Sequence, residues 1–170
     1  MGFVKYTTLT LPYPYPLPSP LTPYFSARGH LLVIIDDHLH APIYHSLADL
    51  YAIKSRSKTI SVLLLTQNLF THAQNAGRYN KEILMNSTLT ILFCNRRDSS
   101  ISRRIGQTIF SGRFQFFMSV YKSAVCEDNS QHKYLAIFTD PSTSRKCELR
   151  SNIFFEEETT ILFWPRKWKA

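Results

Sequence analysis

Four short apolar runs, each followed by polar residues, constrain the fold of this chain more than any other feature. They are Leu31–Ile35, Ile60–Leu65, Leu89–Cys94 and Tyr134–Phe138. The first run has no polar alternation, so it predicts a strand buried on both faces, and we expect the same of the second. Strands of this kind are typical of parallel sheets that carry helices on both sides.

The segments between the runs have helical spacing or polar composition. Pro42–Lys54 predicts a helix, and so does the isoleucine stripe that follows Asp98, a good N-cap. Phe114–Tyr121 is expected to form another helix or irregular packing. A polar loop containing Gly77 is expected between the second and third runs. Because strands alternate with helices, the sequence predicts an α/β fold with a mostly parallel sheet flanked by helices.

Composition divides the chain into three parts. Residues 1–28 include five prolines between Leu11 and Pro20, so we expect an extended, disordered segment. Residues 29–158 form the predicted α/β domain, and residues 159–170 form a basic aromatic tail. No signal peptide and no membrane span are predicted, because prolines interrupt the first residues and the apolar runs are short. We therefore expect an intracellular protein without a membrane partner.

The first predicted strand ends in Asp36 and Asp37. Four apolar residues followed by two acidic ones form the Walker B pattern, in which the first carboxylate holds Mg²⁺ and the second polarises the attacking water. The pattern is short and occurs in many folds. The alternative is a simple turn after a strand, with Asp37 capping the next helix.

Polar residues also follow the second and third strands. Gln67 and Asn68 come about one βαβ step after Asp37, where P-loop ATPases place a residue that senses the γ-phosphate. Arg97 is a candidate arginine finger, because a guanidinium can neutralise transition-state charge. The alternatives are a solvent-facing strand end for Gln67 and an ion pair with Asp98 for Arg97.

Taken together and in order, these segments resemble the genome-packaging ATPases of large DNA viruses. The resemblance is closest to the poxvirus-type enzyme and its Maverick/Polinton and adintovirus-like relatives in the FtsK/HerA P-loop superfamily. It covers residues 31–155 and is carried by the stretches Leu32–Asp37, Ile60–Phe70, Met85–Ser87, Ile91–Asp98, Tyr134–Asp140 and Leu149–Phe154, together with Gln107.

The resemblance implies a partial RecA/FtsK-like sheet and roles for four residues. Asp36 would hold Mg²⁺, Asp37 would activate water, Gln67 would sense the nucleotide with Asn68 beside it, and Arg97 would face the nucleotide or a neighbouring subunit. It also implies ATP as cofactor, a homo-oligomeric ring and double-stranded DNA as partner, in the nucleus, cytoplasm or virion. The formal charge of +8 is compatible with DNA.

The chain departs from this family at the phosphate-binding loop. No Gly-x-x-x-x-Gly-Lys-Ser/Thr segment occurs among its 170 residues. That loop and its lysine supply most of the grip on phosphate. We therefore expect a fragment or degenerate copy with weak nucleotide affinity, and with apolar surface exposed where the first strand and helix would pack.

Two other functions fit the same residues. One is a non-enzymatic α/β module that binds nucleic acid or protein through basic loops and the proline tract. The other is a Mg²⁺ nuclease, which would need a third carboxylate close to Asp36 and Asp37. The sequence offers Asp98, Asp140 and residues 156–158, and none of them is clearly placed beside the pair.

Overall fold

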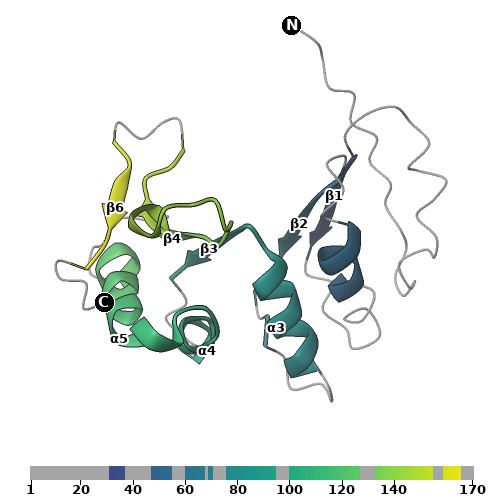
Figure 1. Cartoon of the computed structure of the whole chain (residues 1–170), viewed down its shortest axis with the longest axis horizontal. Helices are drawn as coiled ribbons and strands as arrows, with labels where there is room; N and C mark the ends of the chain where they lie inside the picture. Colours follow the sequence, from purple (N-terminus) through teal and green to yellow (C-terminus); the bar gives the residue numbers. More distant parts are fainter. Residues whose placement is uncertain are drawn as a thin grey trace, which may run out of the picture.

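The structure is a computed structural model that describes residues 31–36, 47–54, 60–67, 69–70, 76–94, 100–126, 133–154 and 159–165. These residues form a mixed α/β fold with two sheets, one of two strands and one of four. Figure 1 shows the sheets in two halves of the molecule, with helix α3 beside the smaller one. The proline-rich segment 1–28 lies outside the described residues.

The smaller sheet, sheet A, pairs β1 (Leu31–Asp36) with β2 (Ile60–Leu65) in parallel. Both strands and their parallel direction were predicted. On one face, alternate residues of both strands pack on the helical residues 47–54, which end in the π-helical turn η1 (Leu50–Lys54). Together with Ile83 they form core A, whose members are Val33, Ile35, Leu47, Ala48, Leu50, Tyr51, Val62, Leu64, Tyr79 and Ile83. The predicted start of this helix at Pro42 lies outside the described residues.

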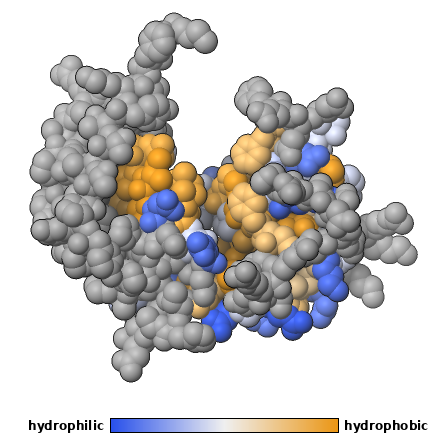
Figure 2. Space-filling model, turned by 180° about the vertical axis from the view of Figure 1, so that it is seen from behind, coloured by the Kyte–Doolittle hydropathy of each residue, from blue (hydrophilic) through white to orange (hydrophobic). Residues whose placement is uncertain are grey.

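The other face of sheet A is open, which differs from the strands buried on both faces that the sequence predicts. Leu32, Ile34, Leu63 and Leu65 are between 44 and 57 % exposed. They alternate with the core A residues along both strands, because successive side chains of a strand point to opposite faces. Figure 2 shows strongly hydrophobic side chains gathered over this part of the molecule. The described helices that pack on sheet A all contact the same face, so both strands are buried on one side only.

Helix α3 (Ala76–Asn86) occupies the stretch that the sequence predicts to be a polar loop around Gly77. The prediction was wrong because Ile83, Leu84 and Met85 are the only large aliphatic residues in a mostly polar segment. Neighbouring residues of α3 enter different cores, Ile83 in core A and Leu84 in the core of the second sheet. The side-chain amide of Asn80 is fully buried and has no hydrogen-bond partner among the described residues.

The larger sheet, sheet B, is antiparallel throughout. Its order is β3 (Leu89–Phe93), β4 (Tyr134–Phe138), β5 (Leu149–Ser151) and β6 (Ile161–Phe163). The third and fourth strands were predicted at these positions, but a mostly parallel sheet was also expected. In the described residues, parallel pairing is confined to β1 and β2. The antiparallel pairing of β3 with β4 leaves the two sheets separate.

Two helices cover one face of sheet B. They are α4 (Ser100–Ile109) and α5 (Phe114–Tyr121), linked by the 3₁₀ turn η2 (Ser111–Arg113) and followed by the π-helical turn η3 (Lys122–Cys126). Another 3₁₀ turn, η4 (Arg145–Cys147), precedes β5. The helix after Asp98 was predicted, although Asp98 itself lies outside the described residues. Of the two alternatives for Phe114–Tyr121, the structure has the helix. The buried side chains of both helices and those of the sheet form core B, which contains Leu84, Ile105, Phe110, Phe117, Val120, Tyr121, Val125, Leu135, Ile137 and Leu149. Among the described parts of the chain, no helix is long and apolar enough to span a membrane.

Tyr51 makes core A sensitive to alkaline pH. Burial raises the pKa of its phenol from 10.0 to about 12, against the opposing effect of a hydrogen bond with the Leu64 backbone. A raised pKa in the folded state means that this contribution to stability is complete below pH 10.0 and is lost as the pH rises through about 12. We expect the urea midpoint of the chain to fall over this interval. Tyr51→Phe should remove that part of the decline, whereas an identical decline in both proteins would contradict the prediction.

Candidate functional site

The candidate site is the edge of sheet A at which β1 and β2 both end. Asp36 is the last residue of β1 and lies opposite Leu65, the last residue of β2. Gln67 follows Leu65 by two residues, and the side chains of Asp36 and Gln67 are both exposed. Because the strands are parallel, their carboxyl ends meet at one edge, which is where ligands bind in open α/β sheets. The structure therefore brings these two predicted residues to the same edge.

The other predicted site residues, Asp37, Asn68 and Arg97, lie outside the described residues. The described edge thus offers one carboxylate and one side-chain amide. Mg²⁺ is usually bound through one or two carboxylates, several waters and substrate phosphates. Asp36 fits such a partial shell and does not make a complete protein-built metal site. No group of three His, Cys, Asp or Glu side chains that could hold a metal occurs among the described residues.

Asp140 does not supply the third carboxylate that a nuclease would need among the described residues. It follows β4 in sheet B, where its Oδ1 accepts a hydrogen bond of 2.8 Å from the Ser142 backbone N–H and a second from the Ser142 hydroxyl. The hydroxyl and then the backbone bond lower the pKa of the Asp140 carboxyl. The Asp140 carboxylate therefore stabilises the turn after β4.

Asp36 lies on the open face of sheet A. The alternation along β1 puts it on the same side as Leu32 and Ile34, and its cross-strand neighbour Leu65 is also exposed on that side. The Asp36 carboxylate is therefore the polar end of an otherwise apolar face of sheet A.

The chain that follows β2 leads from sheet A to core B. Leu69 and Phe70 pack against core B, and the guanidinium of Arg104 on α4 lies 5.6 Å from the centre of the Phe70 ring. Arg104 therefore lies against Phe70, three residues after Gln67. Sequence analysis did not single it out. The available signal was the adjacent pair Arg103 and Arg104 on the polar side of a helix that has an isoleucine stripe on its other side.

The helical region 100–126 carries only positive charge. Arg103, Arg104 and Lys122 are exposed, Arg113 forms an ion pair of 2.7 Å with Glu148, and the segment contains no Asp or Glu. Exposed serine and glutamine side chains lie among these cations. The exposed cations Arg103, Arg104 and Lys122 can contact phosphate groups, whereas Arg113 is neutralised by Glu148. No protein-family model, curated protein or solved structure matches the chain.

Proposed function

We propose that the chain is a fragment or degenerate copy of a viral-type DNA-packaging ATPase with a partial RecA/FtsK-like P-loop fold. One observation carries the proposal: the parallel register of β1 and β2, which puts Asp36 and Gln67 at one sheet edge. This is the arrangement that a Walker B strand and its sensor strand require. It adds to the resemblance in the order and spacing of the surrounding segments.

The residues of this edge have distinct roles in the proposal. Asp36 binds Mg²⁺ directly or through water, and Gln67 orients water toward the γ-phosphate. Mg²⁺, when bound, neutralises charge on the phosphate oxygens. Asp37 would accept a proton from the attacking water, and Arg97 would face the nucleotide or a neighbouring subunit of a ring. The complete protein would use ATP hydrolysis to move double-stranded DNA.

The absence of a phosphate-binding loop from the sequence limits the activity of this chain. A Gly-rich loop binds phosphate through a nest of backbone N–H groups and a lysine. Asp36 and Gln67 replace neither of these groups. We therefore expect the chain to bind Mg²⁺–ATP more weakly than about 1 mM, which corresponds to roughly 4 kcal/mol of binding free energy. Isothermal titration calorimetry on the full chain measures this directly.

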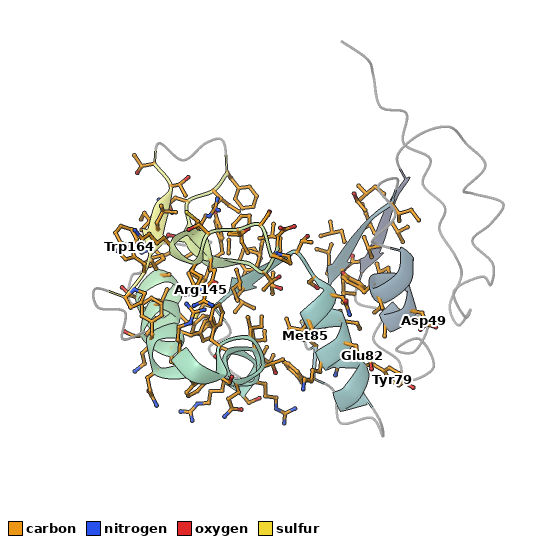
Figure 3. The ribbon with its side chains drawn as sticks, viewed as in Figure 1. Asp49, Tyr79, Glu82, Met85, Arg145 and Trp164 are labelled. Atoms are coloured by element: carbon orange, nitrogen blue, oxygen red, sulfur yellow. The ribbon has the colours of Figure 1, made fainter. Side chains whose placement is uncertain are left out.

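Two variants and one extended protein make the nucleotide experiment decisive. Asp36→Ala removes the proposed Mg²⁺ ligand, and Asp49→Ala is a matched control because Asp49 is exposed on the helical segment 47–54 (Figure 3). A protein in which a strand, a Gly-x-x-x-x-Gly-Lys-Ser loop and a helix precede Leu31 should bind Mg²⁺–ATP. Asp36→Ala should abolish that binding, and Asp49→Ala should leave it intact. Saturable binding by the unmodified chain that survives Asp36→Ala would overturn the proposal.

A non-enzymatic module that binds duplex DNA is the second candidate function. The observation that favours it is the region 100–126, with exposed Arg103, Arg104 and Lys122 and no carboxylate. Contacts to phosphate depend on salt, because each neutralised phosphate releases condensed counterions. Loss of two such contacts should weaken binding for every sequence alike.

For this candidate, the double variant Arg103→Ala/Arg104→Ala should weaken binding to a 20-base-pair duplex of any sequence. The slope of log K against log salt should become shallower by about two, because two phosphate contacts are lost. Lys81→Ala is the control, since Lys81 is an exposed cation on α3. Fluorescence anisotropy between 50 and 200 mM salt, a range over which two phosphate contacts change the affinity roughly tenfold, measures both effects. Equal slopes for the double variant and the unmodified chain would remove α4 from the interface.

A further inference from the structure

We call the face of sheet B that points away from α4 and α5 the outer face. Its centre is buried at Tyr134 and Ala136, whereas Leu89, Phe93 and Leu162 on the two edge strands are 38–60 % exposed. The strand register puts Phe93 beside Tyr134, Ala136 beside Arg150, and Arg150 beside Leu162 on this face. The residues on the opposite side, such as Leu135, Ile137 and Leu149, belong to core B. The members of the outer face belong to neither core; they are Leu89, Ile91, Phe93, Tyr134, Ala136, Phe138, Arg150 and Leu162.

Three aromatic rings form a row at one end of the outer face. The Tyr134 ring lies between Phe93 and Phe154, with ring centres 6.1 and 5.0 Å away and tilted planes. Phe93 is 60 % exposed and Phe154 is 52 % exposed, whereas Tyr134 is buried beneath them. Large apolar rings at this exposure are unusual for residues whose neighbours are well packed, and they present flat surfaces to solvent.

The row is held in place by the backbone. The Ile153 N–H donates a hydrogen bond of 2.7 Å to the Tyr134 hydroxyl, which fixes the segment that carries Phe154. The Tyr121 hydroxyl donates to the Phe93 carbonyl at 3.3 Å from the helical side of the sheet. Both bonds hold the backbone at or next to the exposed rings before any ligand arrives, which lowers the entropy lost on binding.

The charge of the outer face is positive. Arg150 is the single charged residue in the four strands of sheet B, and its guanidinium lies 4.1 Å from the centre of the Phe138 ring. Its Nε donates to the Cys147 carbonyl at 2.7 Å, so the guanidinium plane is held over the ring. Exposed aromatic faces combined with an arginine stacked on a ring are the groups that hold unpaired bases and their phosphates.

We propose that the outer face of sheet B binds single-stranded nucleic acid, with bases stacked on Phe93 and Phe154 and the phosphate backbone near Arg150. A duplex does not fit this chemistry, because its bases are already stacked and paired. The site is separate from the edge of sheet A and from the basic side of α4, so it does not depend on either function proposed above. Because Arg150 is the single charged residue in the strands of sheet B, stacking contributes more than charge and the salt dependence is shallow.

The test measures fluorescence anisotropy of labelled dT20, U20 and a 20-base-pair duplex with the full chain. Phe93→Leu and Phe154→Leu keep apolar volume and remove the ring face, so each should weaken dT20 and U20 binding about tenfold. Phe93→Trp keeps a stacking surface and should retain the affinity. Met85→Leu is the matched control, because Met85 is an equally exposed apolar residue on α3 (Figure 3).

Three results would overturn the proposal. The first is unchanged affinity for dT20 and U20 in both leucine variants, with circular dichroism showing that they are folded. The second is equal affinity for the duplex and the single strands, combined with loss of both in Arg103→Ala/Arg104→Ala, which would assign all binding to α4. The third is the absence of binding of dT20 and U20 by the full chain.

Discussion

Replacing Phe117 with alanine should lower the free energy of unfolding by about 3–5 kcal/mol, the range for a large aromatic residue removed from a core. Phe117 is fully buried at the centre of core B. Its ring lies nearly parallel to those of Phe110 and Tyr121, with ring centres 5.1 and 6.4 Å away. The substitution therefore removes both the transfer free energy of the ring and its contacts with two aromatic neighbours.

Urea denaturation followed by circular dichroism measures this change. Phe93→Ala provides the matched control, since it deletes the same ring from a position that is 60 % exposed, and we expect a loss below about 1 kcal/mol there. If the two variants had the same midpoint, Phe117 would not be the centre of the core.

Gly106→Val is expected to be the second most damaging change, at about 1–3 kcal/mol or more. A Cβ atom at this position would lie 2.5 and 2.8 Å from two atoms of the Phe117 ring and 3.2 Å from the Phe114 ring. The Phe117 ring is fixed between its aromatic neighbours and has no room to move away. Alanine would clash as well, but it would recover up to about 1 kcal/mol of helix propensity, so valine is the sharper test.

Gly112 is the internal control for this prediction. A Cβ atom added there would have no neighbouring atom within 4 Å. Thermal unfolding of Gly106→Val and Gly112→Val should therefore differ by several degrees, with the lower midpoint for the Gly106 variant. A pair of midpoints that agree would mean that α4 and α5 are not as closely packed as described.

The apolar runs were sufficient to predict strands, because a run of large aliphatic residues between polar segments has few other ways to be buried. Leu31–Asp36, Ile60–Leu65 and Tyr134–Phe138 are strands as expected. The same reasoning predicted that Asp36 and Gln67 would reach one edge, which requires only that β1 and β2 be parallel neighbours.

The sequence could not predict which strand pairs with which across a longer distance. The third run pairs in the opposite direction with Tyr134–Phe138, and a run of apolar residues carries no mark of strand direction. The open face of sheet A could not be predicted from the sequence either, since the exposed Leu32 and Ile34 are as apolar as Val33 and Ile35, which pack in core A. The narrow space at Gly106 depends on where Phe117 packs, which spacing along the chain does not show.

Adjacent residues of α3 belong to different cores, Ile83 to core A and Leu84 to core B. The cooperativity of unfolding therefore depends on α3, because unfolding of this helix removes a residue from both cores. Without that link, each sheet could open separately. Amide exchange should therefore show two groups of protection rates, one for each sheet, and α3 should exchange with the less stable group. A ligand that stabilises the edge of sheet A would slow exchange in sheet B only to the extent that it stabilises α3.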